Sequence, residues 1–226
     1  MQSEHDGGVE RDLVRERYYE HRAPVYDETS YRGDPEIDAG LDRESKEIGE
    51  ILSAETGGRV LEVGCGTGLW TPYLRGHVVG IDLIAGMLQL ARQRIPELPL
   101  VQARVPLIPF ATGAFDQLVT ANFYGLLRPA ERLAFLAEAS RLARELIVID
   151  LRSDTDEVSE RIETRRVDGS TYGIFRRRFT PEALQAELDA EVLYPGELFL
   201  AVRKKLTVSG NGSSNGHGSP NGHEAH

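Results

Sequence analysis

Three glycines and one acid form the part of the sequence best suited to chemistry. Residues 60–68 read Val-Leu-Glu-Val-Gly-Cys-Gly-Thr-Gly, which predicts a buried strand that ends abruptly in a glycine loop. Glycine lets the backbone take positive φ and lets a ligand approach without a Cβ in the way. A helix predicted over residues 69–74 would place its free N–H groups beside that loop. A strand, a glycine loop and a helix start indicate a nucleotide-type site.

The spacing of the glycines indicates which class of nucleotide ligand the loop suits. The pattern Gly64-x-Gly66-x-Gly68 differs from the Gly-x-Gly-x-x-Gly turn that holds a pyrophosphate, and no Gly-Lys-Ser/Thr run for a triphosphate is present. Residues 78–82 predict a second strand ending in Asp82. In doubly wound α/β folds, an acid at that place accepts hydrogen bonds from ribose hydroxyls. The loop and Asp82 together favour a nucleoside without a diphosphate.

These two segments resemble the first and second motifs of the class I S-adenosylmethionine-dependent methyltransferases. Residues 82–92 and the pairing of 108–110 (Ile-Pro-Phe) with 115–116 (Phe-Asp) resemble further motifs of the family, in the same order along the chain. The Tyr26-Asp27 pair is similar to the family's amino-terminal lid helix. The resemblance extends over residues 15–205 and implies a small-molecule methyltransferase that uses S-adenosyl-L-methionine as its cofactor.

The resemblance also implies roles for individual residues. Glu62 would lie near the cofactor amine, the glycine loop would cradle the cofactor, and Asp82 would accept from the ribose. Tyr19 and Tyr26 would close over the sulfonium, since an aromatic face attracts a cation. The complete set of predicted cofactor-binding residues is Tyr19, Tyr26, Glu62, Gly64, Cys65, Gly66, Gly68, Asp82, Leu83, Met87, Arg104, Val105, Thr120 and Asn122.

Simpler structural roles stay open for several of these residues. Met87 lies at helical spacing from other apolar residues and suits a core position alone. Glu62 would also satisfy loop N–H groups, and the two tyrosines would also staple the amino-terminal helix. Cys65 suits a small packing residue, because no neighbouring cation in the sequence lowers its pKa.

Arg104 departs from the family pattern. The family usually places an acid here to accept from the adenine amino group, whereas arginine has donors and no acceptor. Arg104 would instead stack on adenine or pair with an acid, and the N–H of Val105 would read the ring.

The sequence identifies no catalytic residue. S-adenosylmethionine carries an activated methyl group, so the protein needs to align donor and acceptor rather than to supply a nucleophile. His21 has the pKa range of a general base but also suits a surface position beside Arg22. Tyr124 and Asp150 are predicted near the carboxyl ends of strands, where sites on such folds are built.

Composition excludes several classes. The chain has 226 residues, of which 40% are hydrophobic and 27% charged, and a formal net charge of −10. That charge argues against a nucleic-acid partner, which usually requires a basic field. Arg176–Arg178 are predicted on a strand, where alternate residues face opposite sides, so they form no single basic stripe. The neighbouring run Arg165-Arg166 is consistent with a modest pocket for an anionic substrate.

The same composition predicts compartment and partners. There is no apolar run of membrane-spanning length and no signal peptide, so we expect a cytoplasmic protein without a membrane partner. A single cysteine excludes an internal disulfide framework. We expect no metal site, a small-molecule acceptor, and allow for a homodimer.

Alternating strand and helix patterns predict the fold. Strands at 59–63, 78–82, 100–103, 117–121 and 145–150 alternate with helices at 85–94 and 130–143, and helices at 12–19 and 36–55 precede them. This order indicates an α/β, doubly wound, mostly parallel Rossmann-like sheet of seven strands. Strands at 191–194 and 198–202 are too close for a crossover and form an antiparallel C-terminal hairpin.

The predicted domain organisation is simple. Residues 1–10 form a flexible amino terminus, residues 11–206 form one methyltransferase domain with lid helices over 11–56, and residues 207–226 form a disordered Gly/Ser/Asn/His tail.

Three functions follow from these features. The first is methyl transfer to oxygen, nitrogen or carbon of a small molecule bound between the amino-terminal helices and a short insertion at 151–173. The second is a catalytically silent subunit that binds the cofactor and supports a partner. An RNA or protein methyltransferase is disfavoured, because the insertion leaves no room for a large recognition domain. The third, a dinucleotide oxidoreductase, is disfavoured by the glycine spacing.

Overall fold

A computed structural model describes residues 3–29 and 35–207, with side chains described for 13–29 and 37–207. The first helix begins at Ser3, so it includes most of the segment 1–10, whose flexibility stays a prediction. The predicted tail lies outside the described residues except for Thr207.

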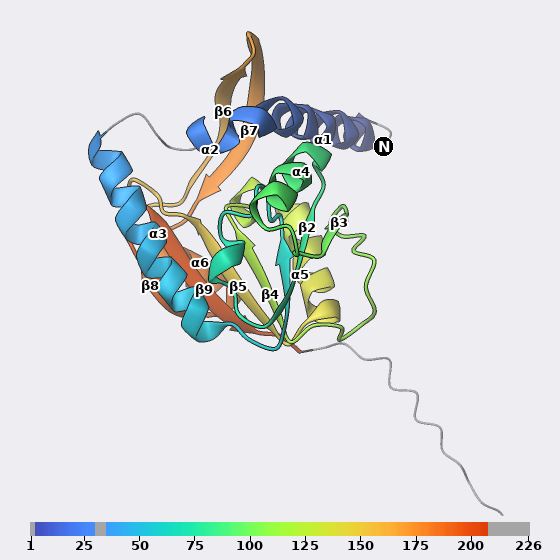
Figure 1. Ribbon diagram of the computed structural model, residues 1–226. Helices are drawn as coiled ribbons and strands as arrows, with labels where there is room; N and C mark the ends of the chain where they lie inside the picture. Colours follow the sequence, from blue (N-terminus) through green and yellow to red (C-terminus); the bar gives the residue numbers. More distant parts are fainter. Residues whose placement is uncertain (1–2, 30–34, 208–226) are drawn as a thin grey trace, which may run out of the picture.

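Seven strands form the main sheet (Figure 1), in the order β3-β2-β1-β4-β5-β9-β8. Neighbours from β3 to β5 pair in parallel, and β9 pairs antiparallel with both β5 and β8. This arrangement confirms the predicted doubly wound sheet with its antiparallel C-terminal hairpin. The strands are β1 (Arg59–Val63), β2 (His77–Asp82), β3 (Leu100–Gln102), β4 (Gln117–Ala121), β5 (Glu145–Leu151), β8 (Glu191–Pro195) and β9 (Phe199–Lys205).

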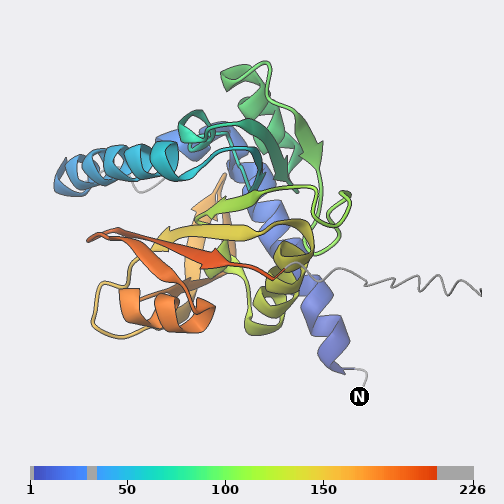
Figure 2. The same cartoon turned by 90° about the horizontal axis from the view of Figure 1, so that it is seen from below.

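The sheet separates two hydrophobic cores. Alternate residues of β5 serve opposite faces, because successive side chains of a strand point to opposite sides. Leu146 and Val148 pack with helix α5 (Pro129–Leu142) and helix α6 (Pro181–Leu188), whereas Ile147 and Ile149 pack with helix α3 (Pro35–Glu55). Figure 2 shows α3 on one side of the sheet and both α5 and α6 on the other.

The predicted helix at 69–74 is wrong. The chain forms turns after β1 and then only a short 3₁₀ helix, η2 (Thr71–Tyr73). Gly68 has φ of 76°, and Pro72 has no N–H to continue a helical ladder, so two breakers interrupt the segment. Trp70 and Leu74 of this segment are buried in the core that packs against α3. The glycine loop therefore does not lead to an α-helix amino end.

A helix and a hairpin lie together above the carboxyl edge of the parallel strands (Figure 1). Helix α1 (Ser3–Arg22) continues through a 3₁₀ turn (Ala23–Val25) into α2 (Tyr26–Thr29), and α1 contacts β6 (Ser159–Val167), β7 (Ser170–Arg178) and helix α4 (Ala85–Arg94). Tyr18 of α1 packs with Ile174 of β7 and with Leu126, forming a small separate core.

The hairpin β6–β7 was not anticipated beyond the placing of Arg176–Arg178 on a strand. Its two-residue turn, Asp168-Gly169, has positive φ at both positions, as tight hairpins require. The Arg176–Arg178 run forms no solvated basic stripe, since Arg176 is buried and all three arginines face carboxylates.

No helix among residues 3–29 and 35–207 is both long and apolar enough to cross a bilayer.

The α5 core contact gives a direct stability test. Phe135 is fully buried against Phe123 and Tyr124, so Phe135→Ala should lower the free energy of unfolding by about 3–5 kcal/mol. Leu133 lies on the same helix but is 71% exposed, so Leu133→Ala should change stability by less than about 0.5 kcal/mol. Urea denaturation measures both variants, and similar losses would contradict the described packing of α5.

Candidate functional site

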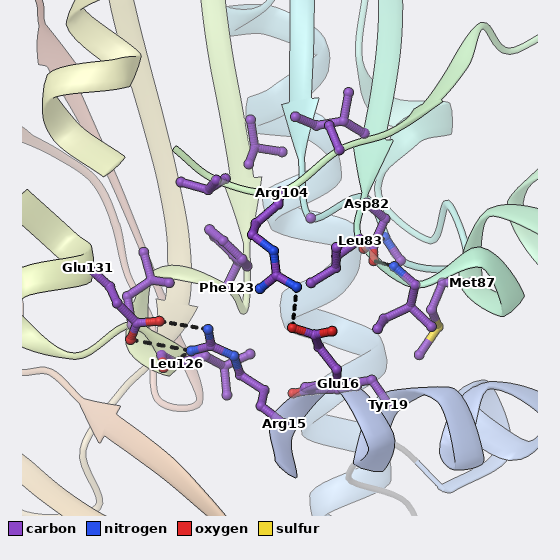
Figure 3. A pocket seen from close by; sticks show the side chains of 18 of the residues that line it. Arg15, Glu16, Tyr19, Asp82, Leu83, Met87, Arg104, Phe123, Leu126 and Glu131 are labelled. Carbon is purple, nitrogen blue, oxygen red and sulfur yellow. Dashed lines mark hydrogen bonds and ion pairs between the residues drawn. The ribbon is translucent and has the colours of Figure 1, made fainter. Parts of the chain in front are cut away.

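A cavity of about 450 Å³ lies at the carboxyl ends of β1, β2 and β4, beneath α1 (Figure 3). Ligands of open α/β sheets bind at this place, outside the carboxyl ends of the strands. The cavity brings together most of the residues predicted to bind a cofactor: Tyr19, Tyr26, Gly64, Gly66, Asp82, Leu83, Met87, Arg104, Val105 and Asn122 line it.

Asp82 fixes the shape of the glycine loop. Its Oδ2 accepts a hydrogen bond from Gly66 N and its Oδ1 accepts one from Ile84 N, each at 2.9 Å. Burial raises the pKa of the Asp82 carboxyl, while these backbone N–H groups act in the opposite direction. The carboxylate therefore joins the end of β2 to the loop after β1 and still borders the cavity.

Two glycines of the loop have left-handed backbones for different reasons. Gly64 has φ of 69°, and a Cβ on it would come within 3.0–3.2 Å of the Phe123 side chain. Gly66 has φ of 55°, and a Cβ on it would meet no atom within 4 Å. The open space beside Gly66 belongs to the cavity, so a ligand can lie against this stretch of backbone.

Asn122 lines the cavity and carries a side-chain oxygen that is unpaired in the part of the chain that the structure describes. It follows β4 with φ of 55°, a conformation that asparagine tolerates better than most residues. Its Oδ1 is buried and has no hydrogen-bond partner among the described residues. Buried polar atoms are normally paired, so this acceptor is suited to a donor on a ligand.

The remaining predicted residues support the cavity without lining it. Thr120 is buried and donates from Oγ1 to Val63 O at 2.8 Å, which joins β4 to β1. Gly68 closes a turn by donating to Cys65 O at 2.9 Å. Cys65 is itself buried, and that burial raises the pKa of its thiol.

Glu62 is also buried, directly behind the loop. Thr71 Oγ1 donates to its Oε2 at 2.5 Å. Burial raises the pKa of Glu62 to about 7; the Thr71 bond opposes this shift, and the charge of Asp82 adds to it. Near neutral pH the group is therefore divided between its carboxylic acid and carboxylate forms.

Two ion pairs fasten α1 over the cavity (Figure 3). Arg15 Nη2 lies 2.6 Å from Glu131 Oε1 on α5, and Glu16 pairs with Arg104 beyond β3. Sequence reasoning allowed Arg104 to pair with an acid but did not identify Glu16, Arg15 or Glu131 as parts of the site. These partners are distant in sequence, so no local spacing signals them.

A second tie joins the lid to the glycine loop. Thr67 Oγ1 donates to Asp27 Oδ1 at 2.6 Å, and Arg94 of α4 pairs with Asp27 while donating to Thr67 O at 2.8 Å. The Tyr26-Asp27 pair was noted in the sequence, but its contact with Arg94 was not predicted.

The three candidate general bases do not line the cavity. His21 Nδ1 is 2.6 Å from the Tyr172 hydroxyl, Tyr124 donates to Glu187 Oε1 at 2.8 Å, and Asp150 accepts from Gly125 N at 2.6 Å. Within the described part of the chain, no group of three or more His, Cys, Asp or Glu residues could hold a metal ion.

Similar proteins share this site region. Residues 60–145 match a family described as "Methyltransferase domain". A malonyl-[acyl-carrier protein] O-methyltransferase from Legionella pneumophila is 43% identical over 28% of this chain and 25% of its own length. A demethylmenaquinone methyltransferase from Beutenbergia cavernae is 33% identical over 54% of this chain and 53% of its own length. An uncharacterized methyltransferase from Alkaliphilus oremlandii is 24% identical over 83% of this chain and 88% of its own length.

Solved structures share the fold. The "DhpI-SAM-HEP complex" superposes with a TM-score of 0.69 at 23% identity, covering 85% of this chain and 96% of its own. Streptomyces venezuelae DesVI gives a TM-score of 0.53 at 19% identity, covering 80% of this chain and 97% of its own.

The sheet order, the glycine loop and the matched domain define a Rossmann-like methyltransferase fold. The match to a methyltransferase domain and the shared fold support the class I S-adenosylmethionine-dependent methyltransferase that the sequence motifs predict. Two of the three relatives are matched over no more than about half of their length, so their substrates do not transfer directly.

The raised pKa of Glu62 predicts a pH-dependent stability. The folded state binds the proton more tightly than the unfolded state, so this stabilising effect is complete below pH about 4.5 and lost as pH rises through about 7. As pH rises from about 4.5 to above 7, the free energy of unfolding of wild type should therefore fall by on the order of 3 kcal/mol relative to that of Glu62→Gln. Urea unfolding of the ligand-free protein at several pH values measures the difference. Glu157→Gln, on an exposed loop, should parallel wild type; a Glu62→Gln curve parallel to wild type would refute the shift.

Proposed function

We propose that the protein transfers a methyl group from S-adenosylmethionine to a small-molecule acceptor by in-line displacement. The arrangement that carries the proposal is the open backbone at Gly66 beside the Asp82 carboxylate, in a cavity that Asn122 also lines. The match to a methyltransferase domain supports the cofactor, and the volume of the cavity supports a ligand of that size.

The residues present suit the cofactor. The loop backbone at Gly64 and Gly66 would lie against it, and the Asp82 carboxylate would accept from its ribose hydroxyls. Leu83 and Met87 would pack on adenine; Met87 is buried beside Ile84 and lines the cavity as well. Bound S-adenosylmethionine supplies a sulfonium whose methyl group is already activated for displacement.

The chain's own task is to orient the acceptor and exclude water. Tyr19 on α1 and Tyr26 on α2 lie with ring centroids 6.3 Å apart at the cavity wall, where their faces would stabilise a cation. The ion pairs of Arg15 and Glu16 hold α1 over the cavity. Holding two reactants in line without water is the main contribution that such an enzyme needs to make.

Arg104 and Glu16 together would contact the adenine ring of the cofactor. The family's usual acid is replaced by Arg104, but the ion pair brings the Glu16 carboxylate into the same part of the cavity. We therefore assign the acceptor for the adenine amino group to the lid rather than to the loop after β3, with the Val105 N–H as the second contact.

The acceptor is a small molecule in this proposal. The segment between β5 and α6 forms one hairpin rather than a recognition domain, and it packs against α1 beside the cavity. A cytoplasmic location and a homodimer remain part of the proposal. The rival function is a cofactor-binding subunit without turnover, because none of the candidate general bases reaches the cavity.

Two measurements separate the alternatives. Isothermal titration should show binding of S-adenosylmethionine and none of NAD, since the loop lacks the pyrophosphate turn. Methyl transfer from labelled S-adenosylmethionine, screened over a metabolite panel, should then yield a methylated product. Cofactor binding without product from any acceptor would support the silent subunit, and preferential NAD binding would reject both readings.

Removing the Asp82 carboxylate should weaken cofactor binding. Asp82→Ala should raise the Kd for S-adenosylhomocysteine at least about tenfold, the scale of one lost charge-assisted hydrogen bond. Asp82→Asn keeps one acceptor for the loop and should show a smaller loss. Asp156→Ala removes an exposed carboxylate of the β5–β6 connection and serves as the control. Isothermal titration measures all three, and unchanged binding by Asp82→Ala would contradict the ribose assignment.

A further inference from the structure

A second, smaller cavity adjoins the first. Its volume is about 210 Å³, and it lies between α1 and the β6–β7 hairpin. Tyr19 lines both cavities, so one side chain of α1 separates them. We call it the arginine pocket; its charged and aromatic lining residues are Tyr18, Tyr19, Arg22, Glu163, Arg165 and Arg176.

Positive charge exceeds negative charge in the arginine pocket. Among the described residues, three guanidinium groups and the carboxylate of Glu163 line it. That carboxylate already faces Arg165, Arg161 at 3.4 Å and Arg178 at 3.3 Å. Burial alone would raise the pKa of Glu163, but these arginines outweigh burial and lower it, so Glu163 stays ionised and engaged. In a chain with a net charge of −10, such a local excess is unusual.

Arg176 places this charge beside the proposed reaction site. The residue is only 6% exposed, and a buried guanidinium is costly unless it is paired. Its Nη1 lies 3.7 Å from Asp150 Oδ1 and donates to Asn122 O at 3.3 Å. Asn122 lines the cofactor cavity and Arg176 lines the arginine pocket, so their hydrogen bond joins the walls of the two cavities.

The donors of the arginine pocket come from rigid elements. Arg165 and Arg176 stand on paired strands, with Arg165 opposite Tyr172 and Arg176 opposite Arg161 in the hairpin register. Arg22 donates from Nη1 to the Tyr18 hydroxyl at 2.9 Å, which orients that phenol at the pocket wall. Guanidinium groups and a phenol that line one small space match the oxygen atoms of a carboxylate, phosphate or phosphonate.

We propose that the arginine pocket binds the oxyanionic group of the methyl acceptor, so that the substrate class is a small anionic molecule. The acceptor would lie across the Tyr19 boundary, with its anion held by Arg165 and Arg176 and its acceptor atom in the cofactor cavity. The assignment rests on the proposed methyl transfer for its biological role, but not for the binding itself.

Inorganic phosphate and acetate, as probes of tetrahedral and planar oxyanions, test the pocket without turnover. Titration calorimetry at low ionic strength should give a Kd on the order of 1 mM for at least one of them. Binding of phosphate alone would indicate a phosphoryl or phosphonyl acceptor, and binding of acetate alone a carboxylate. Binding of neither anion would overturn the proposal.

Variants of the hairpin locate the bound anion. Arg165→Ala should weaken anion binding about tenfold, the scale of one charge-assisted contact. Arg166→Ala removes the same charge from the next residue of β6, which is exposed and absent from the lining, so it should change binding less than about twofold. Equal effects of the two variants would overturn the assignment. If Arg165→Ala lowers the melting temperature, Arg165→Gln replaces it, since it keeps the side-chain length.

Parallel titration with S-adenosylmethionine separates this inference from the proposed function. Both variants should bind the cofactor as wild type does. Cofactor binding and methyl transfer without anion binding would refute the arginine pocket alone. Anion binding that depends on Arg165, in a protein without methyl transfer, would refute the proposed function alone.

Discussion

The site depends on the Asp82 carboxylate at the end of β2. A loop with glycine at every second position has little conformational preference of its own, and no α-helix follows to order it. Asp82 orders the loop by accepting hydrogen bonds from Gly66 N and Ile84 N. One side chain thus joins the loop after β1 to the loop after β2. Burial makes the charged carboxylate costly, and the backbone N–H groups offset that cost. The same charge that shapes the loop is then available to a ligand.

Long-range charge pairs complete the cavity from the other side. Arg15 meets a residue 116 positions away on α5, and Glu16 meets one 88 positions away beyond β3. On α2, Asp27 adds the tie to Thr67 and Arg94. The sheet thus lies on one side of the site, and ion pairs rather than a continuous apolar contact hold α1 and α2 on the other side. Such pairs are partly exposed, so each contributes modestly and this side is easier to open than the core.

Sequence reasoning succeeded where burial is continuous. Strands β1, β4 and β5 are largely apolar runs, and buried parallel strands have this pattern. It failed for residues 69–74, because Trp70 and Leu74 show a helical period while Gly68 and Pro72 prevent the helix. The β6–β7 hairpin was missed because both of its faces carry polar residues, so period-2 alternation is weak.

The site was only half predictable for a related reason. Glycine spacing and a strand-end acid are local signals, and they placed Gly64, Gly66 and Asp82 at the cavity. The lid contacts of Arg15 and Glu16 arise only when the chain folds back on itself. Local sequence carries no record of such contacts.

Neighbouring residues of one helix, Tyr18 and Tyr19, border two different cavities. Any occupant that immobilises α1 from one side lowers the conformational entropy that an occupant of the other side still has to remove. Occupancy of the two spaces is therefore thermodynamically linked, and linkage of this kind is reciprocal. Cooperativity between the occupants of the two cavities would follow from this shared helix, without any change in the sheet beneath.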